Sequence, residues 1–344
     1  MAPEPKVSSV TAHAPCRVDL AGGTVDIWPL YLFHPQAVTV NFAVNVLTRC
    51  RVRRIPGSKL LLRSLDTGRV DQFRDFDQLC AARRFKHPLA GYLLRFFAPE
   101  GGLEIETHSE SPAGAGISGS SALMIATTAA LARYTGRKLS LEEIRVIAQN
   151  VEAQLIGVPT GCQDYYPALY GGVSAIHLGA DGIQREAIAV DPDELDRRFL
   201  LVYTGAPRQS GINNWEVFKA HINGDRRVWR NFDDIVAIAQ EMHRALSAAD
   251  WPEVERLLRA EWKLRKTNAP GISTPLIERL IAGAMKEGAR ASKVCGAGGG
   301  GCLVLLLEEG AKQRVTALVS KLGGRVLPAT VARDGLSFAA GRRK

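Results

Sequence analysis

The alternation of apolar and polar residues predicts that the first hundred residues are mainly extended. Across 38–46, apolar side chains occupy almost every second position, which is the period of a half-buried β-strand. Residues 60–76 read as two short strands around the turn at 66–68, and 103–108 is a further strand candidate. These strands are expected to contribute to a sheet in the N-terminal part of the chain.

Helical periodicity begins near residue 120. Residues 120–134 are apolar on nearly every side, as expected of a buried helix, and Gly136 is a natural stop. Ser140 and Glu143 have the spacing of a capping box, which predicts a second helix from Leu141. The pattern further predicts a hairpin at 181–182, a strand at 199–204, several helices within 213–288, a strand at 302–307 and a helix at 312–322.

Strands followed by helices in each half of the chain predict an α+β protein of two domains. A boundary near 191–196 gives an N-terminal domain at 1–195 and a C-terminal domain at 196–344. The length of 344 residues agrees with this division, because one domain usually takes about 150 residues.

Several classes of protein are not expected from the composition. No apolar run reaches the roughly 18 residues of a membrane span, and the N-terminus has no apolar signal segment. Six cysteines without a Cys-x-x-Cys pair indicate reduced thiols, which together with the missing export signal predicts a cytoplasmic protein. Seven histidines show no metal-ligand spacing, which argues against a zinc site.

The net charge of +9 raises the question of a nucleic-acid partner. Basic clusters occur at 51–54, 83–86 and 342–344, but aromatic residues do not interleave with them as in a single-strand binding platform. We therefore expect a solvated basic surface and no nucleic acid. The charge does suit an anionic small ligand.

A loop at 112–122 carries the strongest chemical signal. It has three glycines and three serines within eight residues, between a strand and a buried helix. Glycines let backbone N–H groups converge, and a helix N-terminus adds partial positive charge, so the loop is suited to phosphate. A hydroxyl in the first helical turn, from Ser120 or Ser121, could ligate Mg²⁺ held by nucleotide phosphates.

Other interpretations of this loop are weaker. A tight turn with a capping serine would need fewer glycines and serines. The loop matches Gly-x-Gly-x-x-Gly, but a dinucleotide-binding unit needs a second strand after the helix, and a capped helix follows instead. No Gly-Lys-Ser/Thr ends the loop, which excludes a Walker A motif, and protein-kinase landmarks are absent from the sequence.

Two carboxylates follow the phosphate-binding candidate. Glu152 lies at the edge of the second helix's apolar stripe, and Asp164 lies in a loop about a dozen positions later. They suggest a metal ligand and a general base, although a solvated rim position would also explain Glu152. A loop at 14–26 offers Arg17 and two aspartates. On its own, a β-turn would explain that loop.

The third glycine loop, at 294–302, is harder to explain as a turn. Five glycines between a helix and an apolar strand raise the entropic cost of folding. Such a cost usually indicates a backbone pressed close to a ligand.

Taken in order, the three loops resemble the motifs of the GHMP small-molecule kinases, which include galactokinase, homoserine kinase and mevalonate kinase. The motifs are Ala-Pro-x-Arg, Pro-x-Gly-x-Gly-x-x-x-Ser-Ser-Ala and Gly-Ala-Gly-Gly-Gly, and the resemblance covers about 14–307. Within the family the sequence is most similar to the D-glycero-D-manno-heptose 7-phosphate kinases, at 21–26, 161–166, 171–172, 262–266 and 271–274.

The resemblance implies an N-terminal α/β domain of ribosomal-S5-like topology, a C-terminal ferredoxin-like domain and a site in the cleft between them. It implies ATP and Mg²⁺ as cofactors, with Ser120 and Glu152 holding the metal. Asp164 would accept the proton of the acceptor hydroxyl, and Arg17 would neutralise charge on the γ-phosphate. The ATP phosphates would lie against Pro112, Gly114, Ala115, Gly116, Ile117, Ser118, Gly119, Ser120 and Ser121.

The acceptor expected from the resemblance is a sugar or sugar phosphate. The protein itself is expected to be a monomer or a homodimer. The contacts of the acceptor would be Asp19, Gly23, Thr24, Asp26, Gly298, Gly299 and Gly300. Heptose phosphate kinases usually read Ala-Gly-Gly-Gly-Thr-Asp where this chain has Gly23-Thr24-Val25-Asp26, so the identity of the sugar stays open.

Three alternatives to a sugar kinase also stay open. They are a kinase of a mevalonate- or homoserine-like alcohol, a catalytically silent metabolite-binding relative and, least favoured, a dehydrogenase. Four basic residues either grip a substrate phosphate or line a solvated helix face, namely Arg208, Lys263, Arg265 and Lys266.

Overall fold

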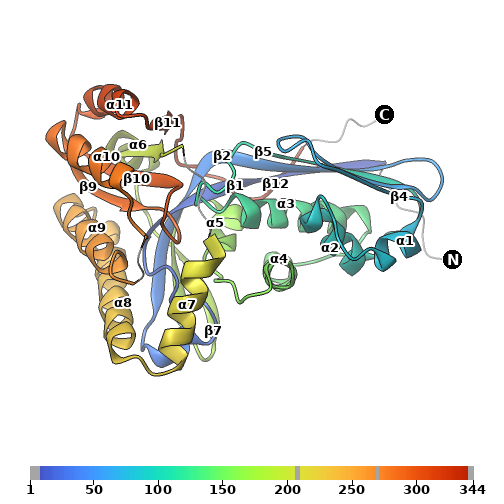
Figure 1. The fold of residues 1–344 in the computed structure, drawn as a ribbon, viewed down its shortest axis with the longest axis horizontal. Coiled ribbons are helices and arrows are strands. Elements are labelled where there is room, and N and C mark those ends of the chain that lie inside the picture. The colour runs from blue at the N-terminus through green and yellow to red at the C-terminus, as the bar shows by residue number, and fades with distance from the viewer. Residues whose placement is uncertain (1–7, 206–209, 269–270, 340–344) are drawn as a thin grey trace.

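The computed structural model describes residues 8–205, 210–268 and 271–339, and it contains two β-sheets with helices packed around them (Figure 1). The larger sheet follows the order β12-β1-β2-β5-β3-β4, with β6 paired to β2 and β7 paired to β6. Its strands are β1 (Ser9–Ala21), β2 (Val38–Arg54), β3 (Leu60–Ser64), β4 (Val70–Phe73), β5 (Leu103–Ser109), β6 (Val173–Gly179), β7 (Gly182–Ala187) and β12 (Ser337–Phe338).

The long strand β2 organises this sheet. Its first part, 38–42, pairs with β6, its last part, 48–54, pairs with β5, and β1 runs antiparallel beside nearly its whole length. β3 is parallel to β5, because two helices connect β4 to β5. The elements between β2 and β8 outside the strands are α1 (Phe76–Ala81), α2 (Pro88–Phe97), α3 (Gly119–Tyr134), α4 (Leu141–Ile156), α5 (Tyr165–Tyr170) and α6 (Pro192–Arg198).

The smaller sheet is antiparallel, in the order β11-β8-β10-β9. Its strands are β8 (Phe199–Tyr203), β9 (Ala289–Val294), β10 (Cys302–Leu307) and β11 (Arg325–Leu327). The helices of this half are α7 (Ser210–Ile222), α8 (Arg226–Ser247), α9 (Trp251–Arg265), α10 (Pro275–Lys286) and α11 (Lys312–Lys321), and a short 3₁₀ helix, η1 (Leu30–Phe33), lies between β1 and β2.

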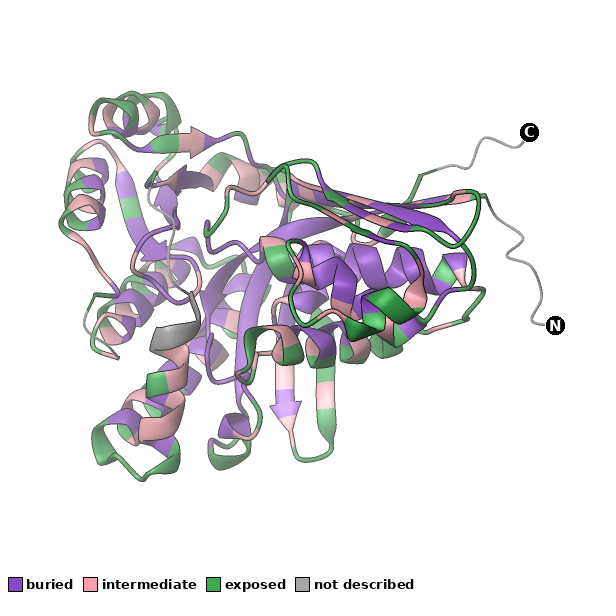
Figure 2. Cartoon of the chain, turned by 45° about the vertical axis from the view of Figure 1, so that its right-hand side comes forward, coloured by how far each residue is buried: buried purple, intermediate pink, exposed green. Residues whose placement is uncertain are grey.

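One continuous core joins the two halves. α3 lies against β1 and β2, and Figure 2 shows it buried along most of its length. The same apolar cluster continues through α8 and α9 into the small sheet, where Val304 and Leu306 of β10 belong to it. A second cluster, between the small sheet and α10 and α11, includes Val202, Leu280 and Val319. The two sheets are therefore held together by buried apolar contacts as well as by the chain connections.

Most elements agree with the pattern analysis. The buried helix, the capping box of Ser140 and Glu143, the 181–182 hairpin and the strand at 302–307 are confirmed. The loop predicted for 14–26 is wrong over its first part, because β1 extends to Ala21. Pro15 lies within this strand, next to a β-bulge, where the pairing of the strands tolerates proline. The helices α1 and α2 interrupt the predicted extended region.

The C-terminal end of the chain returns to the large sheet, where β12 pairs with β1. We propose a domain boundary between residues 195 and 196. The strands of the large sheet then precede the boundary and those of the small sheet follow it, with β12 as the exception. Among the described residues, no helix is long and apolar enough to cross a membrane.

Gly22 fixes the approach of β1 to the start of β2. Its φ is +85°, and a Cβ atom there would lie 2.2 Å from the Val38 carbonyl oxygen. Gly68 has a similar φ, +67°, but nothing lies within 4 Å of its Cβ position, so it is a matched control. We expect Gly68→Ala to cost about 1 kcal/mol of unfolding free energy, and Gly22→Ala about 3 kcal/mol or more.

Urea unfolding of the two variants measures this difference. Equal losses of stability would show that the backbone contact at Val38 has no energetic consequence.

Candidate active site

A cavity of about 840 Å³ collects residues from most of the predicted site. It reaches from the start of α3 to the turn between β3 and β4, and on its other side to α7 and Arg265. The predicted residues that line it are Arg17, Asp19, Gly23, Thr24, Asp26, Pro112, Gly114, Ala115, Gly116, Ser118, Gly119, Ser120, Ser121, Glu152 and Asp164. A cavity of this size is typical of small-molecule sites.

The loop before α3 is built to accept an anion. Gly114 and Gly116 have φ values of 68° and 80°, and Ser118 also has a positive φ of 59°. The Ser118 hydroxyl oxygen is buried and has no hydrogen-bond partner among the described residues. An orphaned hydroxyl at a helix N-terminus fits phosphate, because N–H groups and the helix dipole already favour negative charge there.

The late glycine loop, 294–302, packs against the loop at 112–122, called the phosphate loop below after its predicted role. The Cys302 N–H donates to the Ala115 carbonyl (2.7 Å), and a Cβ at Gly301 would lie 2.6 Å from that same oxygen. Of this loop, Gly296 and Ala297 line the cavity. The absence of a side chain at Gly301 is thus required for contact between the two loops.

The rest of the late loop packs inward. The Gly299 N–H donates to the Ile272 carbonyl (2.8 Å), and a Cβ at Gly298 would lie 2.6 Å from the Ile272 side chain. Contacts of the acceptor with Gly298, Gly299 and Gly300 stay a prediction. Ile117, from the phosphate loop, is also buried, and its carbonyl accepts from the Arg17 N–H.

Ser120 and Glu152 meet at the first turn of α3. The Ser120 hydroxyl donates to one oxygen of Glu152 (2.7 Å), and the Tyr165 hydroxyl donates to the other (2.6 Å). Glu152 is buried, and desolvation raises the pKa of its carboxyl despite these hydrogen bonds. A hydroxyl and a carboxylate beside a phosphate-binding loop are hard oxygen donors, which is the donor set that Mg²⁺ prefers.

Arg17 ties the phosphate loop to Asp164. Its Nε and Nη2 both donate to Asp164 Oδ1 (2.9 and 2.6 Å), and Nη1 donates to the Gly116 carbonyl (2.7 Å). Burial lowers the pKa of Arg17, but the charges of Asp164 and Asp19 raise it further, so the guanidinium stays charged. The Asp164 side chain is 25% exposed and faces the cavity.

Asp19 forms the centre of a buried ionic network behind this pair. It accepts from Arg17 Nη1 (3.3 Å), from the Gly296 N–H (2.9 Å) and, at its second oxygen, from Lys293 Nζ. Desolvation raises the pKa of Asp19, but the charges of Lys293 and Arg17 outweigh it and lower the pKa well below the usual range. Both oxygens of Asp19 therefore have partners within the protein, and a contact of Asp19 with the acceptor stays a prediction.

The network continues to Arg265 through Glu261. Lys293 Nζ lies 4.0 Å from Glu261, whose carboxylate accepts from Arg265 Nε (2.7 Å). Arg265 also donates to the Gly23 carbonyl (3.1 Å) and the Thr24 hydroxyl (3.4 Å). These contacts connect α9 and β9 of the smaller half with the loop after β1.

Asp26 lines the same cavity as Asp164. It is buried and accepts from the Gln163 N–H (2.9 Å). Burial raises the pKa of Asp26 to about 6, and the neighbouring Asp164 adds to this shift. A Cβ at Gly161 would lie 2.1 Å from the Asp26 carboxylate, so that glycine leaves room for it.

The four basic residues that were candidates for binding a substrate phosphate differ in where the structure places them. Arg265 lines the cavity, Lys263 is exposed, and Lys266 pairs with Glu278 (3.3 Å). Arg208 lies outside the described residues.

Sequence reasoning missed Lys293, Glu261 and Tyr165 as parts of the site. The sequence around Lys293 does not single it out, because β9 (Ala289–Val294) contains a second basic residue, Arg290, and a serine. The partner of Lys293 on β1 is 274 positions away, so no local spacing could pair them.

Comparison with known proteins agrees with the three-loop resemblance. The family of GHMP kinases N terminal domains matches residues 79–172, and the family of GHMP kinases C terminal domains matches 242–323. A mevalonate kinase of Archaeoglobus fulgidus is 30% identical over 81% of this chain and 90% of its own length. The chain belongs to the GHMP kinase family.

This GHMP kinase has two further informative relatives. A D-glycero-alpha-D-manno-heptose 7-phosphate kinase of Campylobacter jejuni is 24% identical, over 96% of this chain and 98% of its own. A crystal structure of a D-glycero-D-manno-heptose 1-phosphate kinase from Bacteroides thetaiotaomicron has a TM-score of 0.77 at 21% identity, covering 96% of this chain and 99% of that one. The two-domain α+β fold of the family is thereby confirmed. As a GHMP kinase, the chain is a phosphotransferase with an alcohol group as acceptor.

Lys293→Met tests the buried network. The substitution removes one cationic partner of the buried Asp19 carboxylate. We therefore expect a loss of about 3–5 kcal/mol of unfolding free energy. Lys263→Met, on an exposed position of α9, is the control and is expected to stay within about 0.5 kcal/mol of wild type. Denaturant unfolding measures the loss of unfolding free energy in both variants. Equal losses in Lys293→Met and Lys263→Met would contradict a stabilising role of the buried ionic network.

Proposed function

We propose that the chain is an ATP- and Mg²⁺-dependent kinase that transfers a γ-phosphate to a hydroxyl of a sugar or sugar phosphate, with a heptose 7-phosphate-like acceptor favoured. The observation that carries the proposal is the Arg17–Asp164 pair, which joins the phosphate loop to a carboxylate facing the cavity. A reacting hydroxyl beside Asp164 would lie next to the loop that holds the phosphates. Membership of the GHMP kinases, which use ATP, supports the choice of donor.

The loop at 112–121 and the N-terminus of α3 would hold the ATP phosphates, and Ser120 with Glu152 would hold Mg²⁺. Bound there, Mg²⁺ would neutralise phosphate charge. Tyr165 keeps the Glu152 carboxylate oriented toward Ser120, since its hydroxyl occupies the second carboxylate oxygen.

Asp164 is positioned to receive the proton of the acceptor hydroxyl. Arg17 fixes it by two hydrogen bonds to Oδ1, and its other oxygen, Oδ2, is left to face the acceptor. Because Arg17 also holds the Gly116 carbonyl, the proton acceptor and the phosphate loop keep one relative position. Positioning and electrostatic stabilisation together supply most of the rate enhancement in phosphoryl transfer.

The polar wall beyond Asp164 favours a polyol. Asp26 and Thr24 come from the loop after β1, and Asn214 of α7 accepts from the Thr24 hydroxyl (3.3 Å). Arg265 also lines this wall, and its hydrogen bonds to Gly23 and Thr24 hold the loop after β1 in place. The similarity to a heptose 7-phosphate kinase over almost the whole chain supports the same acceptor class.

A second candidate is a kinase of a mevalonate-like alcohol. The observation in its favour is the 30% identity with a mevalonate kinase, which exceeds the 24% identity with the heptose 7-phosphate kinase. A small alcohol with one carboxylate needs fewer polar partners than the wall formed by Asp26, Thr24 and Asn214 provides.

An acceptor panel decides between the candidates. We would measure ADP release from Mg-ATP by the full chain with heptose 7-phosphate, hexoses, mevalonate and homoserine. Release stimulated most by the heptose 7-phosphate supports the favoured acceptor, and release stimulated only by mevalonate supports the second candidate. No stimulated release across the panel contradicts both and favours a silent metabolite-binding relative.

Asp164→Asn tests the proton acceptor. The amide keeps the shape of the side chain but cannot take a proton, so we expect kcat to fall by about 10²–10⁴-fold with the fold intact. Steady-state kinetics with the best acceptor, together with far-UV circular dichroism, check this. Unchanged turnover refutes the assignment of Asp164 as the base.

The pH profile tests Asp26. Above about pH 6 its carboxyl is ionised and accepts hydrogen bonds from acceptor hydroxyls, and below that pH it becomes protonated. We expect kcat/KM for the acceptor to fall about tenfold per pH unit well below this value, since kcat/KM reports groups of the free enzyme. In Asp26→Asn this acid limb should disappear. An identical limb in both proteins assigns the titration to another group.

A further inference from the structure

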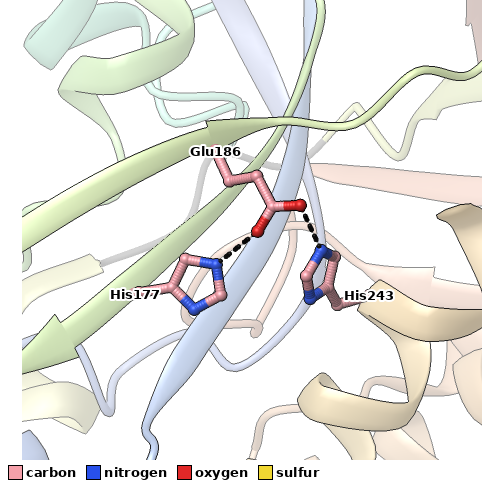
Figure 3. Close-up of side chains that lie close together, drawn as sticks. All are labelled: His177, Glu186 and His243. Atoms are coloured by element: carbon pink, nitrogen blue, oxygen red, sulfur yellow. Dashed lines mark hydrogen bonds and ion pairs between the residues drawn. The ribbon is translucent and has the colours of Figure 1, made fainter.

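A cluster of two histidines and a glutamate lies outside the cavity. His177 comes from β6, Glu186 from β7 and His243 from α8, and Figure 3 shows both imidazoles directed at the one carboxylate. The distances are 2.8 Å from His177 Nε2 to Glu186 Oε2 and 3.0 Å from His243 Nε2 to Glu186 Oε1. None of the three residues lines the active-site cavity.

The fold holds these three side chains in place. In the β6–β7 hairpin, His177 is opposite Gln184 and Ala175 is opposite Glu186, so His177 and Glu186 are diagonal neighbours on one face. α8 is packed near the same hairpin by an apolar cluster that includes Ile176 and Phe232. Next to His243, Met242 is fully buried and anchors that turn of the helix.

The possible ligand atoms lie close enough together to bind one ion after small adjustments. The two imidazole nitrogens and a carboxylate oxygen lie within 4.8 Å of one another. Around a tetrahedral ion with bonds of about 2.0–2.1 Å, neighbouring ligand atoms are about 3.3 Å apart, so adjustments of side-chain rotamers suffice.

We propose that His177, Glu186 and His243 form a binding site for a divalent transition metal of the Zn²⁺ class, which fastens α8 to the β6–β7 hairpin. Imidazole nitrogen suits Zn²⁺, Co²⁺ and Ni²⁺ and not Mg²⁺, so the site is chemically distinct from that of Ser120 and Glu152. Two of the side chains are partly exposed and the glutamate is exposed, which gives the ion an entry path and leaves a fourth position to water.

Metal binding requires each imidazole to release its contact with the carboxylate. An ionised carboxylate only accepts, so both Nε2 atoms carry hydrogen in the structure. With the ion bound, the proton of each ring sits on Nδ1 and the Nε2 lone pair faces the metal. The expectation against zinc from the sequence rested on local spacing, whereas these histidines are 66 positions apart and meet only through packing.

Zinc titration of the full chain tests the site. The protein is stripped with EDTA, dialysed and titrated with ZnCl₂ by calorimetry in excess MgCl₂, which occupies oxygen-donor sites. We expect one Zn²⁺ per chain, with the dissociation constant raised at least about 10–100-fold in His243→Asn and in Glu186→Gln. His108→Asn, on β5, and Cys80→Ser, an exposed thiol, are the controls and should bind like wild type.

A second measurement, of the melting temperature Tm, distinguishes loss of metal binding from loss of folding in a variant. Zn²⁺ should raise the Tm of wild type and of both controls and leave the Tm of His243→Asn and Glu186→Gln unchanged, with circular dichroism reporting the folded state. No bound Zn²⁺ in wild type shows that the cluster is a hydrogen-bonded triad only. Equal binding in wild type and the two cluster variants places the ion elsewhere. Either outcome overturns the proposal.

Discussion

The carboxylate of Asp19 is the interaction on which the site depends. It lies on β1 of the large sheet, almost fully buried, and is held by Arg17 from its own strand, Lys293 from β9 and the Gly296 N–H. A buried charge is tolerated only when it is paired and hydrogen-bonded. The large sheet, the small sheet and the late glycine loop therefore have to meet at this one group.

The proposed chemistry follows from that constraint. With Asp19 in place, Arg17 points to Asp164 on one side and to the Gly116 carbonyl on the other. The late loop, whose Gly296 binds Asp19, also carries Cys302, which binds the phosphate loop at Ala115. Donor site and proton acceptor are thus held by one connected set of contacts, which suits a reaction that depends on positioning.

Much of the fold and of the candidate site was predictable from the sequence because the patterns that indicate them are local. The capping box at Ser140, the buried helix α3 and the glycine-rich loop before it are short patterns with a direct physical reason, and the structure has all three. Arg17, Asp26, Glu152 and Asp164 were found through such motifs, and they line one cavity.

The rest could not be predicted because it depends on contacts between distant segments. Lys293 meets Asp19 across 274 positions, and the buried Glu152 accepts hydrogen bonds from Ser120 and Tyr165, which lie 32 and 13 positions away. The strand β1 was missed as far as Ala21, and its pairing with β2, which includes a register shift after Pro15, joins segments that local patterns do not connect.

A double-mutant cycle in kcat tests most directly whether the buried network acts through Asp164. It compares wild type, Lys293→Met, Asp164→Asn and the double variant, with the acceptor that stimulates ADP release most. If Lys293 and Asp19 serve to position Arg17 and Asp164, Lys293→Met lowers kcat in wild type and changes it little once Asp164 is replaced. Fully additive losses would contradict the account.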